Sequence, residues 1–97
     1  MAAAITGCTS TQFTPNSGVK IITVTTPATA DSANTMDITD KAVTGGDTLA
    51  TLWGVIGAYD NTTGDAVTAT WTSAGVITID VGGGTADHTY RVIAFGK

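Results

Sequence analysis

The second half of the chain alternates between apolar and polar residues, which is the pattern of a β-strand with one buried face. Residues 66–72 alternate between apolar residues and threonines, and residues 76–81 alternate between Val or Ile and Thr or Asp. Residues 51–59 and 88–96 are rich in β-branched and aromatic residues, which also favours strands. Four short strands separated by turn-rich segments predict an antiparallel meander.

The first half of the chain gives two further strands and an irregular start. Residues 19–26 are β-branched at nearly every position and end before Pro27, and residues 35–39 alternate. Both patterns predict strands. Residues 1–18 show no sustained periodicity, so we predict an extended N-terminal arm, with a disordered tail as the alternative. Residues 19–97 are predicted to form a single β domain.

The strand predicted over 51–59 has a competing helical pattern. Four apolar residues lie at helical spacing: Leu49, Leu52, Trp53 and Ile56. Gly54 and Gly57 oppose a helix, because glycine costs about 1 kcal/mol relative to alanine at an interior helical position. We therefore predict a strand, and a helical turn just before it stays open as an alternative. Residues 40–47 are predicted to be a loop.

Two predicted strands are apolar on both faces. In residues 88–96 one face would carry Tyr90, Val92 and Ala94, and the other Ile93 and Phe95. In residues 51–59, Trp53 and Val55 would lie opposite Leu52 and Ile56. An antiparallel strand with one solvated face should alternate, so a partner is expected to cover the second face. The predicted oligomer interface consists of Leu52, Trp53, Val55, Tyr90, Val92, Ile93 and Phe95.

The composition agrees with an all-β fold. Threonine accounts for 21 of the 97 residues, glutamate is absent, and all eight acidic residues are aspartates. Threonine is β-branched and suits a half-exposed strand, whereas leucine, lysine, glutamine and arginine, which with glutamate fill ordinary helices, are scarce. We predict a small antiparallel β-sandwich or barrel of about six strands with the N-terminal arm attached.

The core should be thin for a domain of this size. Fourteen of the apolar residues are alanines, and small domains bury a low fraction of their surface. One cysteine excludes an internal disulfide, and a single histidine gives no zinc-binding spacing. Oligomerisation or docking onto a larger assembly remains as the expected source of additional stability.

Charge and hydropathy argue against two classes of partner. The net charge is −4, and the four basic residues are scattered, so nucleic-acid binding is not expected. No apolar stretch approaches the roughly 20 residues of a membrane-spanning helix. Residues 5–8 have the outline of a lipoprotein cleavage box, but no basic residue precedes them. We therefore expect synthesis in the cytoplasm without lipidation.

Two local patterns resemble catalytic or phosphate-binding motifs without their essential parts. The glycines at 82–84 precede a predicted strand rather than a helix, so they predict a hairpin turn. Asp87 and His88 are adjacent, and neighbours on a strand point to opposite faces, so they do not predict a catalytic pair. We predict no enzyme, no catalytic residue and no cofactor.

Two further sets of residues resemble sites for calcium and for sugars. Asp60, Asn61 and Asp65 lie in one predicted loop but miss the EF-hand spacing, so turn formation explains them and no metal site is predicted. Aromatic residues can stack on sugars, but core packing is the favoured interpretation of this set: Trp53, Tyr59, Trp71 and Tyr90.

Three stretches carry a resemblance to a known class of proteins. They are KIITVTTPATADSANTMDITD (20–40), TATWTSAGVITIDVGGGTADHTY (68–90) and the C-terminal RVIAFGK. In composition and layout the chain resembles the small Thr/Ala/Gly-rich β proteins of tailed-bacteriophage virions, particularly the decoration (cement) proteins of the head. The resemblance implies a β-rich fold, oligomers that are often trimers, binding to the outer surface of the capsid shell, and no catalytic residues.

The expected function is therefore that of a virion structural protein on the capsid surface, made in the host cytoplasm. Its expected partners are the major capsid protein and copies of itself. The arm is expected to contact the shell through Ile5, Cys8 and Phe13, by adding a strand to a neighbour's sheet edge. The alternatives are a secreted or surface β module, either a filament subunit or a glycan-binding domain, and a tail or fibre component of the same virion.

Overall fold

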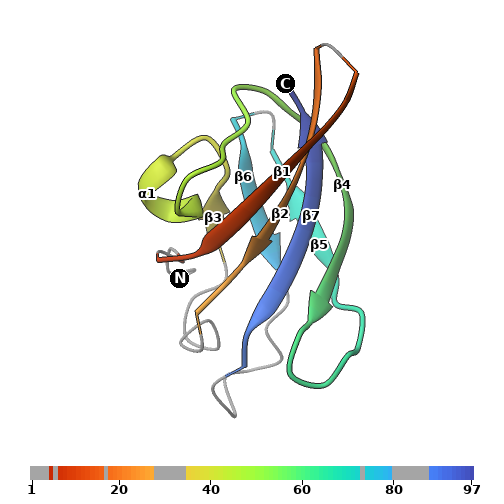
Figure 1. Ribbon diagram of the computed structural model, residues 1–97. Helices are drawn as coiled ribbons and strands as arrows, with labels where there is room; N and C mark the ends of the chain where they lie inside the picture. The colour runs from red at the N-terminus through yellow and green to blue at the C-terminus, as the bar shows by residue number, and fades with distance from the viewer. Residues whose placement is uncertain (1–4, 6, 17, 28–34, 73, 80–87) are drawn as a thin grey trace.

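The chain folds into two antiparallel β-sheets, which confirms the predicted all-β, sandwich-like class. The computed structural model describes residues 5, 7–16, 18–27, 35–72, 74–79 and 88–97. The four-stranded sheet has the order β1-β2-β7-β4, and the three-stranded sheet has the order β3-β6-β5 (Figure 1). The strands are β1 (Thr9–Asn16), β2 (Val19–Thr25), β3 (Thr35–Asp37), β4 (Leu52–Asp60), β5 (Ala69–Trp71), β6 (Val76–Ile79) and β7 (Tyr90–Gly96).

The core lies between the two sheets. In β2 and β7 every second residue points inward, so Ile22, Val24 and Val92 are fully buried while Ile21 and Ile93 are only partly buried. The facing sheet contributes apolar residues at the same period of two, as packing of one sheet on another requires. Its fully or almost fully buried side chains are Met36, Ile77 and Ile79.

The N-terminal segment departs from the predicted arm. Residues 9–16 form β1, which pairs antiparallel with β2 from Thr9↔Thr25 to Asn16↔Val19. Ile5 and Cys8 precede β1 and are buried in the core, where their N–H groups donate to the carbonyls of Thr35 and Val43. Both faces of this edge strand carry exposed polar residues, so its sequence shows no alternation of apolar and polar positions.

The loop predicted over 40–47 contains one helical turn, α1 (Lys41–Thr44), and this part of the prediction was wrong. The Asp40 carboxylate accepts from the Ala42 N–H at 2.9 Å and caps the N-terminus. Gly45 ends the turn in the left-handed conformation (φ 83°) and donates to the Lys41 carbonyl. Aspartate and glycine also favour loops, so the sequence did not distinguish a capped turn of helix from a loop. The helical turn considered just before residue 51 does not form.

Two irregularities in β4 change which of its residues face the core. The register runs Leu52↔Gly96, Gly54↔Phe95, Val55↔Ala94 and Gly57↔Ile93, so Trp53 and Ile56 are the extra residues of two β-bulges. Leu52 and Val55 consequently pack in the core, while Trp53 and Ile56 are exposed. The predicted pairing of Trp53 with Val55 on one face and of Leu52 with Ile56 on the other was wrong.

The two glycines of β4 sit beneath aromatic rings. A Cβ atom on Gly54 would lie 2.8 Å from Cε1 of Phe95, and one on Gly57 would lie 2.8 Å from the hydroxyl oxygen of Tyr59. Real side-chain atoms do not approach so closely, so each ring occupies the space that a side chain on the glycine would need. The aromatic residues thereby cover the otherwise weak glycine positions of the strand.

Candidate functional site

An apolar surface covers the outer face of the four-stranded sheet. Phe13, Ile21 and Phe95 are successive partners across β1, β2 and β7, and Phe95 lies opposite Gly54 of β4. Phe13 is 64% exposed, and the bulge residues Trp53 and Ile56 are 46% and 57% exposed. The outer patch is defined here as Phe13, Ile21, Trp53, Ile56, Ile93 and Phe95.

The outer patch continues around the edge of β4 onto the second sheet. Trp71 of β5 is 45% exposed, and its Cζ2 atom lies 3.7 Å from the position of a Cβ atom on Gly54. The ring of Phe95 lies against the same position. Trp71 therefore extends the apolar surface beyond the sheet edge.

This face carries almost no charge. In the outward-facing positions of β1, β2, β7 and β4 the other residues are mostly threonines, and Arg91 is the one charged residue among them. Asp60 of β4 points inward, because it pairs with Tyr90 on the core side of β7. Charge on the outer face would therefore not hinder binding of an apolar partner or of another copy of the chain.

The residues predicted for an oligomer interface divide between this surface and the core. Leu52, Tyr90 and Val92 are 6%, 2% and 0% exposed and belong to the chain's own core, so they cannot form an interface. Val55 is partly buried and packs against that core. Trp53, Ile93 and Phe95 belong to the outer patch and stay candidates. Bulges and sheet packing decide this division, and neither is visible in a single strand's pattern.

The residues predicted for shell contact divide in the same way. Ile5 and Cys8 are 2% and 4% exposed, so they cannot meet a partner on the surface of this fold. Burial raises the pKa of the Cys8 thiol to about 11, which makes it an unreactive core residue. Phe13 alone of the three stays exposed.

The four aromatic residues considered for sugar stacking lie partly in the core and partly on the surface. Tyr90 is buried, so the core interpretation is confirmed for it. Trp71 was likewise expected in the core, and this was wrong, because β5 lies at a sheet edge and leaves the ring 45% exposed. Trp53 and Tyr59 are exposed as well, at 46% and 37%.

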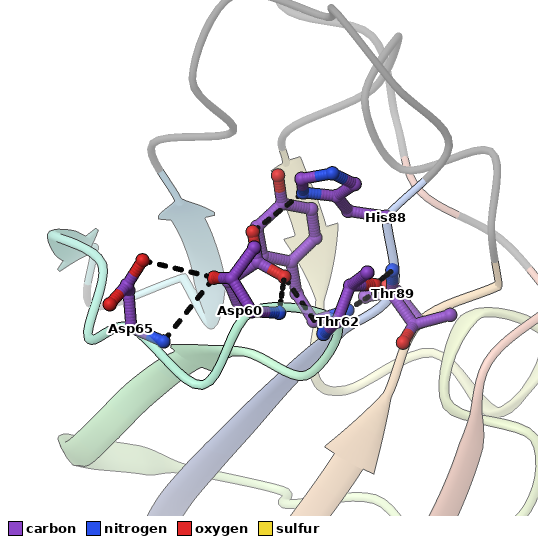
Figure 2. A network of polar contacts seen from close by, with 8 residues as sticks. Asp60, Thr62, Asp65, His88 and Thr89 are labelled. Atoms are coloured by element: carbon purple, nitrogen blue, oxygen red, sulfur yellow. Dashed lines mark hydrogen bonds and ion pairs between the residues drawn. The ribbon is translucent and has the colours of Figure 1, made fainter.

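A second cluster joins the end of β4 to the start of β7 (Figure 2). The Oδ1 atom of Asp60 accepts from the N–H groups of Thr62 and Thr63 at 2.9 and 3.2 Å. Its Oδ2 atom lies 2.6 Å from Nδ1 of His88. The Thr62 hydroxyl accepts from the Thr89 N–H at 3.1 Å, and the Asn61 N–H donates to the Thr89 carbonyl at 2.8 Å.

The electrostatics of this cluster favour an ionised Asp60. Burial acts to raise the pKa of its carboxyl group, since the side chain is only 10% exposed. The hydrogen bonds from the N–H groups of Thr62 and Thr63 and from His88 outweigh that burial, so the pKa lies below the ordinary 3.8. Charge on a protonated His88 lowers it further.

Among the described residues, the Asp60–His88 pair links two segments of the chain. An aspartate that orients an imidazole is half of a catalytic triad, but a triad also needs a nucleophile that contacts the second ring nitrogen. Within the described part of the chain, the side chain of His88 contacts Asp60 and the ring of Tyr90, the latter at a centroid distance of 6.3 Å. The contacts made by the pair hold the β4–β5 connection against the start of β7.

In the loop that follows β4, the carboxylates accept hydrogen bonds from within the chain. Both oxygens of Asp60 accept from protein groups, and Asp65 accepts from the Thr63 hydroxyl at 3.1 Å. Over the residues that the structure describes, no group of three or more His, Cys, Asp or Glu could hold a metal ion. Asp87 and the glycines at 82–84 lie outside the described residues, as does Val81.

Sequence reasoning missed the Asp60–His88 pair, because its members are 28 residues apart and meet only when β4 and β7 are neighbours. A weak local signal was present in Asp60-Asn61-Thr62-Thr63, the pattern of an aspartate that accepts from the backbone two residues on.

Comparison with known proteins adds no relative to this description. No protein-family model, no curated protein and no solved structure matches the chain. In the described residues no helix is long and apolar enough to cross a membrane.

Proposed function

We propose that this chain is a virion structural protein that decorates a capsid shell, binding its outer surface and stabilising it. Its partners would be the major capsid protein and copies of itself. The observation that carries the proposal is the outer patch, because soluble monomers rarely expose large contiguous apolar surfaces that serve no interaction. The choice of a capsid as the assembly rests on the resemblance in composition and layout to phage head decoration proteins.

The size of the apolar surface suits a protein interface. Among the described residues, five large hydrophobic side chains are between 37% and 64% exposed: Phe13, Trp53, Ile56, Tyr59 and Trp71. At about 150–250 Å² for a whole aromatic side chain, they expose together on the order of 450 Å². A standard interface buries about 800 Å² per partner, of which roughly 57% is apolar, so it needs a similar apolar area.

The mechanism would be mass action. A protein that binds the assembled shell but not its separated subunits stabilises the shell by the free energy of that binding. Such a role needs shape and apolar contact and requires no catalytic group. It also suits a thin-cored domain, because the shared interface adds buried apolar surface to what the chain buries alone.

The test first asks whether a major capsid protein is encoded beside the gene for this chain, and then uses shells assembled from that capsid protein. The wild-type chain is expected to co-sediment with these shells and to raise their melting temperature. Trp53→Ser and Ile56→Ser should weaken binding by roughly tenfold or more, because each removes apolar area from the outer patch. Thr68→Ser, at an exposed position outside the strands, serves as the control.

Two results would contradict the proposal. One is a gene neighbourhood that encodes no capsid protein, and the other is a folded chain that fails to co-sediment with shells. Binding to purified tails in place of shells would instead favour the tail or fibre role.

A second candidate function is a surface module that binds glycans. The exposure of Trp53, Tyr59 and Trp71 favours it, since flat aromatic rings open to solvent are what sugars stack on. On a glycan array, specific binding that is lost in Trp53→Ala and Trp71→Ala would support this module over the capsid protein. An array without signal would remove it.

A further inference from the structure

The two sheets end in four edges, and three of them are protected against pairing with other strands. β3 and β5 are three residues long, which is too short to guide another strand. β4 carries two bulges, and residues beyond it already pair with it through Tyr59↔Ala66 and the bond from the Val67 N–H to the Ala58 carbonyl, 2.9 Å. Bulges and covering segments are the usual means of closing an edge.

The fourth edge, β1, is free of bulges from Thr9 to Phe13, a regular stretch longer than β3 or β5. Its eight residues, TSTQFTPN, contain no charge, and the register with β2 is regular from Thr9 to Phe13. Residues 11–15 are all exposed. At the hairpin end, pairing would be interrupted by a register shift between Phe13 and Asn16 and by Pro15, which lacks a backbone N–H.

The segment around α1 covers only the start of this edge. The Cys8 N–H donates to the Val43 carbonyl at 3.0 Å, and the Asp47 N–H donates to the Ser10 hydroxyl at 2.9 Å. Among the described residues, the backbone of Thr9–Asn16 has no hydrogen-bond partner in the chain other than β2. From Thr11 to Thr14 the backbone groups of β1 that face away from β2 therefore have no partner among the described residues.

We propose that β1 pairs antiparallel with β1 of a second copy about a two-fold axis. This pairing would join the two four-stranded sheets into one continuous eight-stranded sheet. The pairing gives hydrogen-bond partners to the open backbone groups of both copies at once, because an isologous contact uses the same surface on each copy. Although the chain carries a net charge of −4, the seam itself carries no charged side chain, so like charges do not oppose the pairing.

The same comparison of edges sets the number of copies. Within the described part of the chain, β1 is the only long open edge. Once β1 of a second copy occupies it, no such edge is left for a third copy, so the assembly closes as a dimer. A trimer built by strand pairing, as the resemblance would imply, needs a second open edge on each copy. In the dimer the two outer patches would lie on the same side of one sheet, free to meet a larger surface.

The inference rests on the proposed function only in taking the chain as a subunit of an assembly. The contact between copies does not require a capsid, and it leaves the outer patch available for the shell.

The test introduces one substitution on each face of β1. Thr11→Lys and Gln12→Lys place a charge on opposite faces of β1, where Thr11 pairs with Thr23 and Gln12 with Ile22. A loss of dimer in both variants assigns the contact to the strand edge, because a contact through either face would respond to one variant only. Thr68→Lys makes the same change at an exposed position outside the strands.

Sedimentation velocity should find the wild-type chain and Thr68→Lys as dimers. Both edge variants should be folded monomers by circular dichroism, with a dimer dissociation constant raised at least roughly tenfold. Hydrogen exchange should show that those backbone N–H groups of residues 11–14 that face away from β2 become protected as the wild-type concentration increases.

Three results would overturn the inference. They are a wild-type monomer up to about 100 μM, a trimer, and a dimer that survives both edge variants but dissociates in Trp53→Ser. A dimer that behaves as expected but does not bind shells would contradict the proposed function alone. A monomer that binds shells would contradict this inference alone.

Discussion

At the scale of single residues, the Asp60 carboxylate connects three segments of the chain. It accepts from the turn that follows β4 and pairs with His88 just before β7. Because its pKa is lower in the folded chain than the ordinary 3.8, folding favours the ionised form. This group therefore contributes stability above its unfolded pKa and loses it as pH falls through its folded pKa.

The corresponding prediction concerns acid stability. Asp60→Asn should lower the melting temperature at neutral pH, because the amide cannot reproduce the charge-assisted bond to His88. The difference between the two melting temperatures should shrink as pH falls below the ordinary 3.8 and vanish below the lower pKa of folded Asp60, where the wild-type carboxylate becomes protonated in the folded chain as well. Asp47→Asn is the control, because that carboxylate makes no hydrogen bond with the described residues. A constant difference between wild type and Asp60→Asn from pH 7 to about pH 2 would contradict the assignment.

Gly45 and Gly64 differ in why the position requires a glycine: backbone conformation alone, or conformation together with a lack of space. Both have positive φ, 83° and 85°, so an alanine at either position is strained by about 1–2 kcal/mol. A Cβ atom on Gly64 would meet nothing within 4 Å, whereas one on Gly45 would lie far inside the contact distance of the Cys8 carbonyl oxygen. The Gly45 position therefore carries a steric requirement in addition to the conformational one.

We predict that Gly45→Ala destabilises the fold clearly more than Gly64→Ala does. The Cys8 carbonyl belongs to backbone that precedes β1, so it cannot move aside as a flexible side chain would. Urea unfolding of both variants measures the difference, which we expect to exceed about 1 kcal/mol. Equal losses in the two variants would mean that the α1 segment does not pack against Cys8 as described.

At the scale of elements, β4 shows what the sequence pattern can and cannot reveal. The existence of this strand and its approximate limits followed from its β-branched and aromatic content, as they did for β2, β6 and β7. The faces could not be predicted, because each bulge adds one residue and reverses the alternation beyond it. The bulges are anchored by Phe95 and Tyr59 lying over Gly54 and Gly57, which are contacts made only in the assembled sheet.

Leu52 and Ile56 give the sharpest test of those bulges. The simple alternation places them on one face, whereas in the structure Leu52 is 6% exposed and Ile56 is 57% exposed. Leu52→Ala should therefore cost about 2–4 kcal/mol, in the range for a buried leucine. Ile56→Ala should change the free energy of unfolding by less than about 1 kcal/mol. Similar losses at the two positions, measured by urea unfolding, would support an unbulged strand.

The candidate sites were predictable to different extents for related reasons. The double apolar pattern of residues 88–96 correctly indicated that Ile93 and Phe95 lie opposite Tyr90 and Val92. It could not say which face the chain's own second sheet would cover. Phe13 had no pattern around it, and the Asp60–His88 pair depends on strand order, which local periodicity does not encode.

At the scale of the whole molecule, the N-terminal segment is part of the domain. Ile5 and Cys8 fill the core, and β1 covers the edge of β2 with a hairpin register that runs from Thr9 to Asn16. An extended arm could be removed without effect on the rest of the chain. A strand with core residues attached cannot, because its removal opens a cavity and exposes the edge of a formerly central strand.

We therefore predict that a chain beginning at Val19 does not fold stably. Loss of Ile5 and Cys8 removes two buried side chains, and loss of β1 leaves the backbone groups of β2 unpaired on one side. Circular dichroism should show no cooperative melting at 25 °C or above, and light scattering should show aggregation through the exposed edge. Full-length Phe13→Ser, which changes an exposed β1 residue without removing the strand, should melt close to the wild type. A truncated chain that melts cooperatively near the wild-type temperature would restore the separable arm and remove the structural basis for pairing through β1.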